Sequence, residues 1–339
     1  MSMQSPGDAT VPANAMACLV SRLRLPVVAA PMFLVSGPEL VLAACRAGIV
    51  GAFPTPNARP TEVLDQWMRR ITEGLARAAH EQDPATIGPW CANLVTHSSN
   101  ARLPEDLRLI TRYRPPLVVT ALGSPKPALQ PVHDYGGWVV ADVTTLALAR
   151  KAAAAGVDGL ACICSGAGGH TGFLSPFAFV SAVRTFFDGL VIVGGGIADG
   201  WGVAGAIAAG ADLVYMGTRF IATSQSMATP AYKQMLIDCS AQDIVTSAAL
   251  TGTPANWLAP SLRAHGIDAA QAGPAAPPDF DSSDVHKPGR WRDLWAAGHG
   301  VGAVTAVQPV AGVVEHLRAE YRRASARFAR RTQENIHAH

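Results

Sequence analysis

The sequence predicts an α/β fold, a (β/α)8 TIM barrel with a C-terminal excursion and a terminal helix. From Pro26 onward, short apolar runs alternate with longer alanine-rich amphipathic stretches, as in repeated βα units around a parallel sheet. The apolar runs come to eight, and most are continuously apolar, as parallel strands buried on both faces should be. The chain of 339 residues is long enough for one barrel of about 250 residues with insertions.

The apolar runs give eight candidate strands in chain order. They are Val27–Ala30, Gly48–Phe53, Pro89–Asn93, Leu117–Thr120, Gly137–Ala141, Gly159–Cys164, Leu190–Val193 and Asp212–Met216. The predicted helices lie between and after them, over Gly37–Ala47, Thr61–His80, Glu105–Tyr113, Thr144–Ala155, Phe177–Phe187, Gly200–Ala209 and Gln225–Cys239. Thr144 or Thr145 can accept amide hydrogen bonds at a helix start. Gly156 and Gly210 each follow an alanine-rich run, where a left-handed residue ends a helix.

The composition changes after residue 240, so we expect a barrel core over 20–240 and a C-terminal extension over 241–339. Within the extension, 251–290 reads as a long loop that could form a lid, because it is rich in Ala, Gly and Pro and then in acidic residues. The stretch Val310–Arg330 has helical spacing with Arg-rich faces. We expect it to pack on the barrel exterior as a final helix that frays afterwards.

The composition also excludes several function classes. Net charge is only +2, from 27 basic and 25 acidic residues without a dense basic stripe, so nucleic acid is not an expected partner. No signal peptide and no run of about 18 apolar residues is evident, so no membrane contact is expected and the location should be cytoplasmic. Cys162 and Cys164 lack a second ligand pair, so they should pack in the core and no metal site is expected.

In a TIM barrel the functional groups follow the C-terminal ends of the strands. The first strand ends in Ala30, Pro31 and Met32, where Pro fixes φ and Met can lie against a flat ring. The third ends in Asn93, whose amide can donate to and accept from a heterocycle. Taken alone, the first feature also reads as a strand stop and the second as a turn residue.

Two glycine-containing loops follow the seventh and eighth strands, where TIM barrels commonly bind phosphate. Three glycines precede a helix in the first loop and allow backbone N–H groups to approach a phosphate near the helix N-terminus. The residues concerned are Gly194, Gly195 and Gly196 in the first loop and Met216, Gly217 and Thr218 in the second.

His170 follows the sixth strand within Ser165-Gly-Ala-Gly-Gly-His-Thr-Gly172. The glycines should leave this histidine open to a ligand at the barrel mouth, and an ordinary histidine pKa near 6.5 suits proton transfer near neutrality. A loop histidine that serves only as a hydrogen-bond partner is the alternative. Other histidines, such as His80 and His299, have no comparable context.

These five motifs, in this order from about Pro26 to Phe220, resemble the nitronate monooxygenase family, formerly called 2-nitropropane dioxygenases. The resemblance implies an FMN-binding barrel that oxidises nitroalkanes or alkyl nitronates with O2. It places Ala30, Pro31 and Met32 near the isoalloxazine, Asn93 on its edge, and Gly168 and Gly169 along the flavin. It gives the phosphate to the loops at Gly194–Gly196 and Met216–Thr218, and makes His170 the base that removes the proton α to the nitro group.

The sequence departs from the family pattern at one place. Oxidative members usually carry a Gln and a Glu before the Ala-Gly-Gly-His loop, and Ile163 and Gly166 stand at the aligned positions here. Similar FMN barrels act as enoyl reductases, acyl-CoA oxidoreductases or NAD(P)H:quinone reductases. The 251–290 excursion could cover such a larger substrate, with Lys287 and Arg290 among the basic residues near an anionic group.

A different class of function is a flavin-free barrel that binds a phosphorylated metabolite through the same two loops. It would need a further carboxylate or lysine at a strand end, and Asp142 after the fifth strand could supply one. We interpret Asp142 instead as a cap for the following helix. The oligomeric state stays open at the level of sequence.

Overall fold

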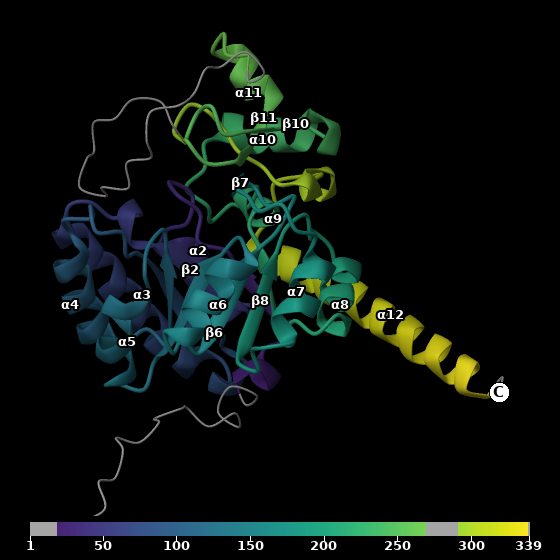
Figure 1. Ribbon diagram of the computed structural model, residues 1–339, viewed down its shortest axis with the longest axis horizontal. Helices are drawn as coiled ribbons and strands as arrows, with labels where there is room; N and C mark the ends of the chain where they lie inside the picture. Colours follow the sequence, from purple (N-terminus) through teal and green to yellow (C-terminus); the bar gives the residue numbers. More distant parts are fainter. Residues whose placement is uncertain (1–18, 269–290, 338–339) are drawn as a thin grey trace, which may run out of the picture.

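The computed structural model describes residues 19–268 and 291–337 and shows the predicted closed parallel barrel (Figure 1). Its strands are hydrogen-bonded in the circular order β1-β2-β3-β4-β5-β6-β8-β9. Their bounds are β1 Val27–Ala29, β2 Val50–Pro54, β3 Trp90–Val95, β4 Leu117–Ala121, β5 Trp138–Val143, β6 Gly159–Ile163, β8 Leu190–Gly194 and β9 Leu213–Met216. All eight predicted strands are confirmed, with ends that differ by one or two residues.

The barrel has an inner and an outer apolar cluster, because successive side chains on a strand point to opposite faces. The buried residues of the inner cluster all come from strands, and their side chains fill the interior of the barrel. They include Val28, Cys91, Val140, Ile192 and Tyr215. Intervening strand residues join the helices in the larger outer cluster. The last inward-facing residue of each strand therefore lies on the inner floor of the barrel mouth.

Helices surround the barrel. They are α2 Pro38–Arg46, α3 Thr61–Glu81, α4 Leu103–Tyr113, α5 Lys126–His133, α6 Leu146–Ala154, α7 Pro176–Arg184, α8 Gly200–Ala208, α9 Thr218–Ile221 and α10 Pro230–Asp238. Gly156 and Gly210 have φ of 91° and 106°, as their predicted role after a helix requires. Helix α5 was not predicted, because it has eight residues and Pro131 lies inside it.

Two helix starts differ from the sequence prediction. Helix α10 begins at Pro230, after the Thr229 hydroxyl accepts the amide of Tyr232, and not at Gln225. Helix α6 is capped by Thr145, whose hydroxyl accepts the Leu148 amide. The prediction of Asp142 as the cap was wrong, since this residue belongs to β5.

Regular structure lies just before and within the 251–290 stretch, which is predicted from the sequence as a long loop. Strands β10 (Ile244–Ser247) and β11 (Ala255–Leu258) pair antiparallel, and β11 pairs with β7 (Gly169–His170). A short helix α11 (Ala259–Ala264) follows. Strand β11 is only four residues long and buried throughout, so it shows no alternation of polarity to identify it. Residues 269–290 of the excursion, with Lys287 and Arg290, lie outside the described residues.

The terminal helix α12 (Val310–His337) packs its first half against α8 and α2, and its second half extends past the barrel (Figure 1). Val310, Val313 and Leu317 are fully buried, whereas Phe328 is 64% exposed. The predicted fraying after Arg330 is not seen, since the helix continues to His337. None of the helices in the described part of the chain is long and apolar enough to cross a membrane.

Candidate active site

The turn after β1 is fixed by two buried or half-buried polar side chains. The Ser36 hydroxyl accepts the Met32 amide at 3.0 Å and donates to the Ala30 carbonyl at 3.2 Å. The Asn57 side-chain amide donates to the Met32 carbonyl at 2.9 Å. A Cβ on Gly217 would lie 3.4 Å from the Met32 sulfur, so the first and last loops of the barrel meet at the mouth.

The loop after β8 needs glycine, because Gly195 and Gly196 have φ of 153° and 69°. A Cβ on Gly195 would lie 2.6 Å from the Ser165 carbonyl oxygen. Gly196 is exposed, and within the described part of the chain its amide donates to no acceptor. This loop therefore offers a free backbone donor to an anion, as the sequence analysis expected.

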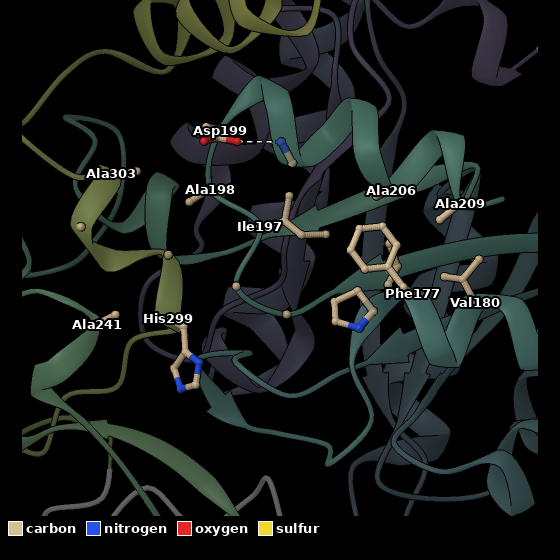
Figure 2. Close-up of a pocket in the computed structure, with 17 residues that line it drawn as sticks. Phe177, Val180, Ile197, Ala198, Asp199, Ala206, Ala209, Ala241, His299 and Ala303 are labelled. Carbon is tan, nitrogen blue, oxygen red and sulfur yellow. Dashed lines mark hydrogen bonds between the residues drawn. The ribbon is translucent and has the colours of Figure 1, made fainter. Parts of the chain in front are cut away.

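Carboxylates already accept two of the first amides of α8. Asp199 accepts the Gly202 amide at 2.7 Å (Figure 2), and Glu320 of α12 accepts the Gly200 amide at 2.9 Å. The loop before the helix therefore offers an anion its free Gly196 amide without competition from these two side chains.

A cleft with a volume of about 380 Å³ opens beside this loop between α7, α8 and residues 299–303 (Figure 2). His299 lines it, and its Nδ1 lies 3.2 Å from where a Cβ of Gly166 would stand. The His299 amide donates to the Gly166 carbonyl at 2.9 Å. The sequence analysis gave His299 no role, because only the folded chain brings this segment to the glycine loops.

The eighth-strand loop also contacts the C-terminal part of the chain. The Thr218 hydroxyl accepts the Gly298 amide at 2.9 Å and keeps its own proton to donate. A Cβ on Gly168 would lie 2.7 Å from the Gly298 nitrogen. The glycine at 168 is therefore needed for close packing of the histidine loop on residues 297–298.

His170 lies in a strand and not in a free loop. It pairs with Ala255 of β11, while the neighbouring pair is Gly169 and Asn256. The Asn256 amide donates to the Ala167 carbonyl at 2.7 Å, and its oxygen accepts the Thr246 hydroxyl. The small sheet built from the excursion therefore fixes the backbone that carries His170.

His170 is half-buried, because an indole lies against it. The ring centroids of His170 and Trp291 are 5.4 Å apart, and Trp291 stacks on Trp257 at 4.5 Å. Burial lowers the pKa of His170 below its ordinary value, because desolvation disfavours the imidazolium. The ring is therefore biased toward the neutral form that can accept a proton.

This contact gives a testable prediction for Trp291. Replacing Trp291 by alanine should expose His170 and raise its pKa toward 6.5. The acid limb of the pH–rate profile reports the free base, so it should move to higher pH in the variant. Trp201→Ala, on the half-exposed Trp201 of α8, is the matched control. An unchanged acid limb in Trp291→Ala would show that the contact with Trp291 does not set the pKa of His170.

The floor of the mouth carries two inward-facing polar side chains from the strands. Asn93 is 6% exposed, and its amide donates to the Val119 carbonyl at 3.3 Å. Asp142 of β5 has a buried Oδ1 without a hydrogen-bond partner among the described residues, and burial raises its pKa to about 7. The structure thus puts Asp142 inside the barrel mouth, where the sequence analysis had preferred a capping role.

The structure brings most of the predicted positions to one end of the barrel. The turn after β1, the loops after β6, β8 and β9, and strand β7 lie at that end. Asn93 lies below them on the inward face of β3. Ile163 faces inward and packs on the inner cluster. Gly166 has φ of 83° and lies against His299, so a larger side chain there would be both strained and crowded. His299, Trp257 and Trp291 had no signal in the local sequence.

Comparisons with known proteins agree with this geometry. The family model described as nitronate monooxygenase matches residues 16–276. The chain is 30% identical to a nitronate monooxygenase of Paraburkholderia phytofirmans, over 75% of this chain and 78% of that protein. It is 28% identical to a (3aS,4S,5R,7aS)-5-hydroxy-7a-methyl-1-oxo-octahydro-1H-indene-4-carboxyl-CoA dehydrogenase of Rhodococcus jostii, over 68% and 61% of the two chains.

Among solved structures, a nitroalkane oxidase from Streptomyces ansochromogenes superposes with a TM-score of 0.76 at 24% identity, covering 92% of this chain and 99% of that one. That likeness supports the barrel fold. The match of the family model over most of the barrel and the excursion decides the relationship. The chain is a flavin-dependent oxidoreductase and belongs to the nitronate monooxygenase family.

Proposed function

We propose that the protein binds FMN at the barrel mouth and oxidises nitroalkanes or their nitronates with O2, with His170 as the general base. The observation that carries the proposal is the position of His170. It lies in β7, directly after the glycine loop that follows β6, and a Cβ on Gly166 of that loop would lie 3.3 Å from the Gly196 nitrogen. A small substrate between this ring and a flat cofactor would meet the base directly.

The residues present fit FMN in three respects. The exposed Gly196 amide and the Thr218 hydroxyl are donors suited to a phosphate. Ala30 and Met32 give the first turn an apolar surface for a ring. The buried Oδ1 of Asp142 lacks a partner among the described residues, so the floor has polar capacity that a heterocycle could use. Gly168, Gly169, Gly195 and Gly217 would line the cofactor on the remaining sides.

His170 would act on the neutral nitroalkane. One ring nitrogen accepts the proton from the carbon α to the nitro group, the C–H bond breaks, and its electron pair moves onto the nitro group to give the nitronate. A pKa below the ordinary histidine value keeps the ring neutral at pH 7, which is the form that this step needs. FMN, when bound, supplies the acceptor for the electrons that pass to O2.

The proposal is tested by anaerobic mixing of the flavin-loaded protein with separate panels of nitronates, NAD(P)H and acyl-CoA thioesters. Bleaching of the flavin absorbance near 450 nm by nitronates alone is the expected result. Reduction only by NAD(P)H or by thioesters would reject the nitronate assignment. A purified protein that binds no added FMN would reject the cofactor as well.

A second candidate is oxidation or reduction of an acyl-CoA thioester by the same barrel. It is favoured by the similarity to the Rhodococcus jostii enzyme, whose name gives it a carboxyl-CoA substrate. The half-buried indole of Trp291, which stacks on the buried Trp257, would then offer an apolar wall to a larger acyl group. The thioester panel of the same experiment decides between the two candidates.

A further inference from the structure

Asp142 lies on the floor of the barrel mouth, near the C-terminal end of β5. Along β5, Val140 belongs to the inner cluster, so the strand alternation turns Asp142 inward as well. Its backbone neighbour in the sheet is Ala161 of β6, which also faces inward. Asp142 is therefore the last inward-facing residue of β5, whereas Asn93 is followed on the inward face of β3 by Val95.

The carboxyl has no charged partner in this position. Its Oδ1 is buried and accepts or donates no hydrogen bond within the described part of the chain. The titratable groups that face it are the Tyr215 phenol from β9 and the Cys91 thiol from β3, both of which have pKa values raised by burial and by the Asp142 charge. The flanking strands β4 and β6 turn Val119, Ala161 and Ile163 inward, and none of these is ionisable.

Tyr215 of β9 is a second polar side chain in the barrel interior, across from Asp142 of β5. It is 7% exposed, and its hydroxyl also lacks a partner among the described residues. Two unpaired polar groups in one apolar interior cost free energy unless a ligand or water meets them. Asp142 is the more accessible of the two, because the residue as a whole is only half-buried while its Oδ1 is covered.

Burial raises the pKa of Asp142 to about 7, so at neutral pH a large fraction of the carboxyl carries its proton. A protonated carboxyl is a donor, and the natural partner of a donor is a carbonyl oxygen or an unprotonated ring nitrogen. A planar cofactor that lies on the strand ends presents such atoms to the floor, whereas the substrate must lie higher to reach His170.

We propose that the Asp142 carboxyl is a cofactor-binding group that donates its proton to an acceptor atom on the isoalloxazine edge of FMN. The inference rests on the proposed function, since it assumes that FMN lies at this mouth. A donor at Asp142 also makes the affinity for FMN depend on pH, an effect that His170 and the loop at Gly194–Gly196 would not produce. Each FMN that binds through this contact requires one protonated Asp142, so cofactor affinity should fall as pH rises through the pKa of this group.

The test is titration of the apoprotein with FMN at several pH values between 6 and 8, with quenching of flavin fluorescence as the signal for binding. For wild type, a required proton with a pKa of about 7 predicts a dissociation constant about tenfold larger at pH 8 than at pH 6. Asp142→Asn keeps a donor at every pH, so its dissociation constant should change less than twofold. Riboflavin, which has no phosphate, should show the same contrast, because the phosphate ionisation is then absent.

Two further variants complete the experiment. Asp142→Ser also keeps a donor at every pH, so it replaces Asp142→Asn if that variant does not fold and should likewise show a flat profile. Asp188→Asn, at an exposed position before β8, is the matched control and should keep the tenfold change. A flat wild-type profile, or an equal slope in wild type and Asp142→Asn, overturns the proposal for Asp142. Absence of FMN binding at any pH in wild type instead overturns the proposed function.

Discussion

Replacing His170 by asparagine should slow flavin reduction by a neutral nitroalkane by about 10²-fold or more while flavin content stays nearly intact. Asparagine cannot accept the α-proton, and the backbone pairing of position 170 with Ala255 does not depend on the side chain. The measurement is the anaerobic rate of bleaching in a stopped-flow instrument, with protein saturated with FMN.

The substrate itself supplies the control for this prediction. A preformed nitronate has already lost its α-proton, so the same variant should be reduced by it at a rate much closer to wild type. His80→Asn, at an exposed position near the end of α3, tests for a general effect of removing a histidine and should behave as wild type. Equal rates for His170→Asn and wild type with the neutral substrate would remove His170 from the reaction.

A carboxylate at position 196 should abolish most FMN binding. Gly196 has φ of 69° and is exposed, and Asp and Asn tolerate this left-handed region better than most residues. Like charges about 5 Å apart repel by about 3 kcal/mol at an effective dielectric constant of about 20, and solvent screening lowers this to about 2 kcal/mol. We therefore expect FMN affinity to fall about 30-fold in Gly196→Asp relative to Gly196→Asn.

The pair of variants separates charge from shape, because asparagine and aspartate have nearly the same size. Riboflavin binding reports on the rest of the site, since without a phosphate it should distinguish the two variants by less than about threefold. Gly302→Ala, where a Cβ would meet no atom within 4 Å on the same cleft, should bind FMN as wild type does. Equal FMN affinities in Gly196→Asp and Gly196→Asn would place the phosphate elsewhere.

The three-stranded sheet of β10, β11 and β7 holds His170 in place although glycines precede it in the chain. Gly168 and Gly169 leave room for neighbouring backbone and for the edge of Trp291. The hydrogen bond from Asn256 to Ala167 and the pairing with β11 supply the rigidity that these glycines lack. Substitutions in β11 should therefore affect the reaction through the placement of His170, although they lie outside the barrel.

The sequence by itself determined the barrel, because most strands are continuous apolar runs and each run is followed by helix or loop chemistry that local residues specify. The run Leu190–Val193 and the three glycines that follow it, for example, show strand, loop and helix start within one short stretch. Short-range rules also placed the candidate histidine and both candidate phosphate loops at strand ends, and the barrel fold brings all strand ends to one face.

Only the tertiary structure decided what surrounds those groups. Trp291 and His299 lie far along the chain from His170 and Gly166, respectively. Trp291 contacts His170 and stacks on Trp257 of β11, the strand that pairs with β7, while the His299 amide donates to the Gly166 carbonyl. Asp142 shows the same limit at short range. The residues next to it in the sequence are compatible with a helix cap. Its burial without a hydrogen-bond partner among the described residues follows only from closure of the barrel, because burial depends on the strands that face Asp142 and not on its neighbours in the sequence.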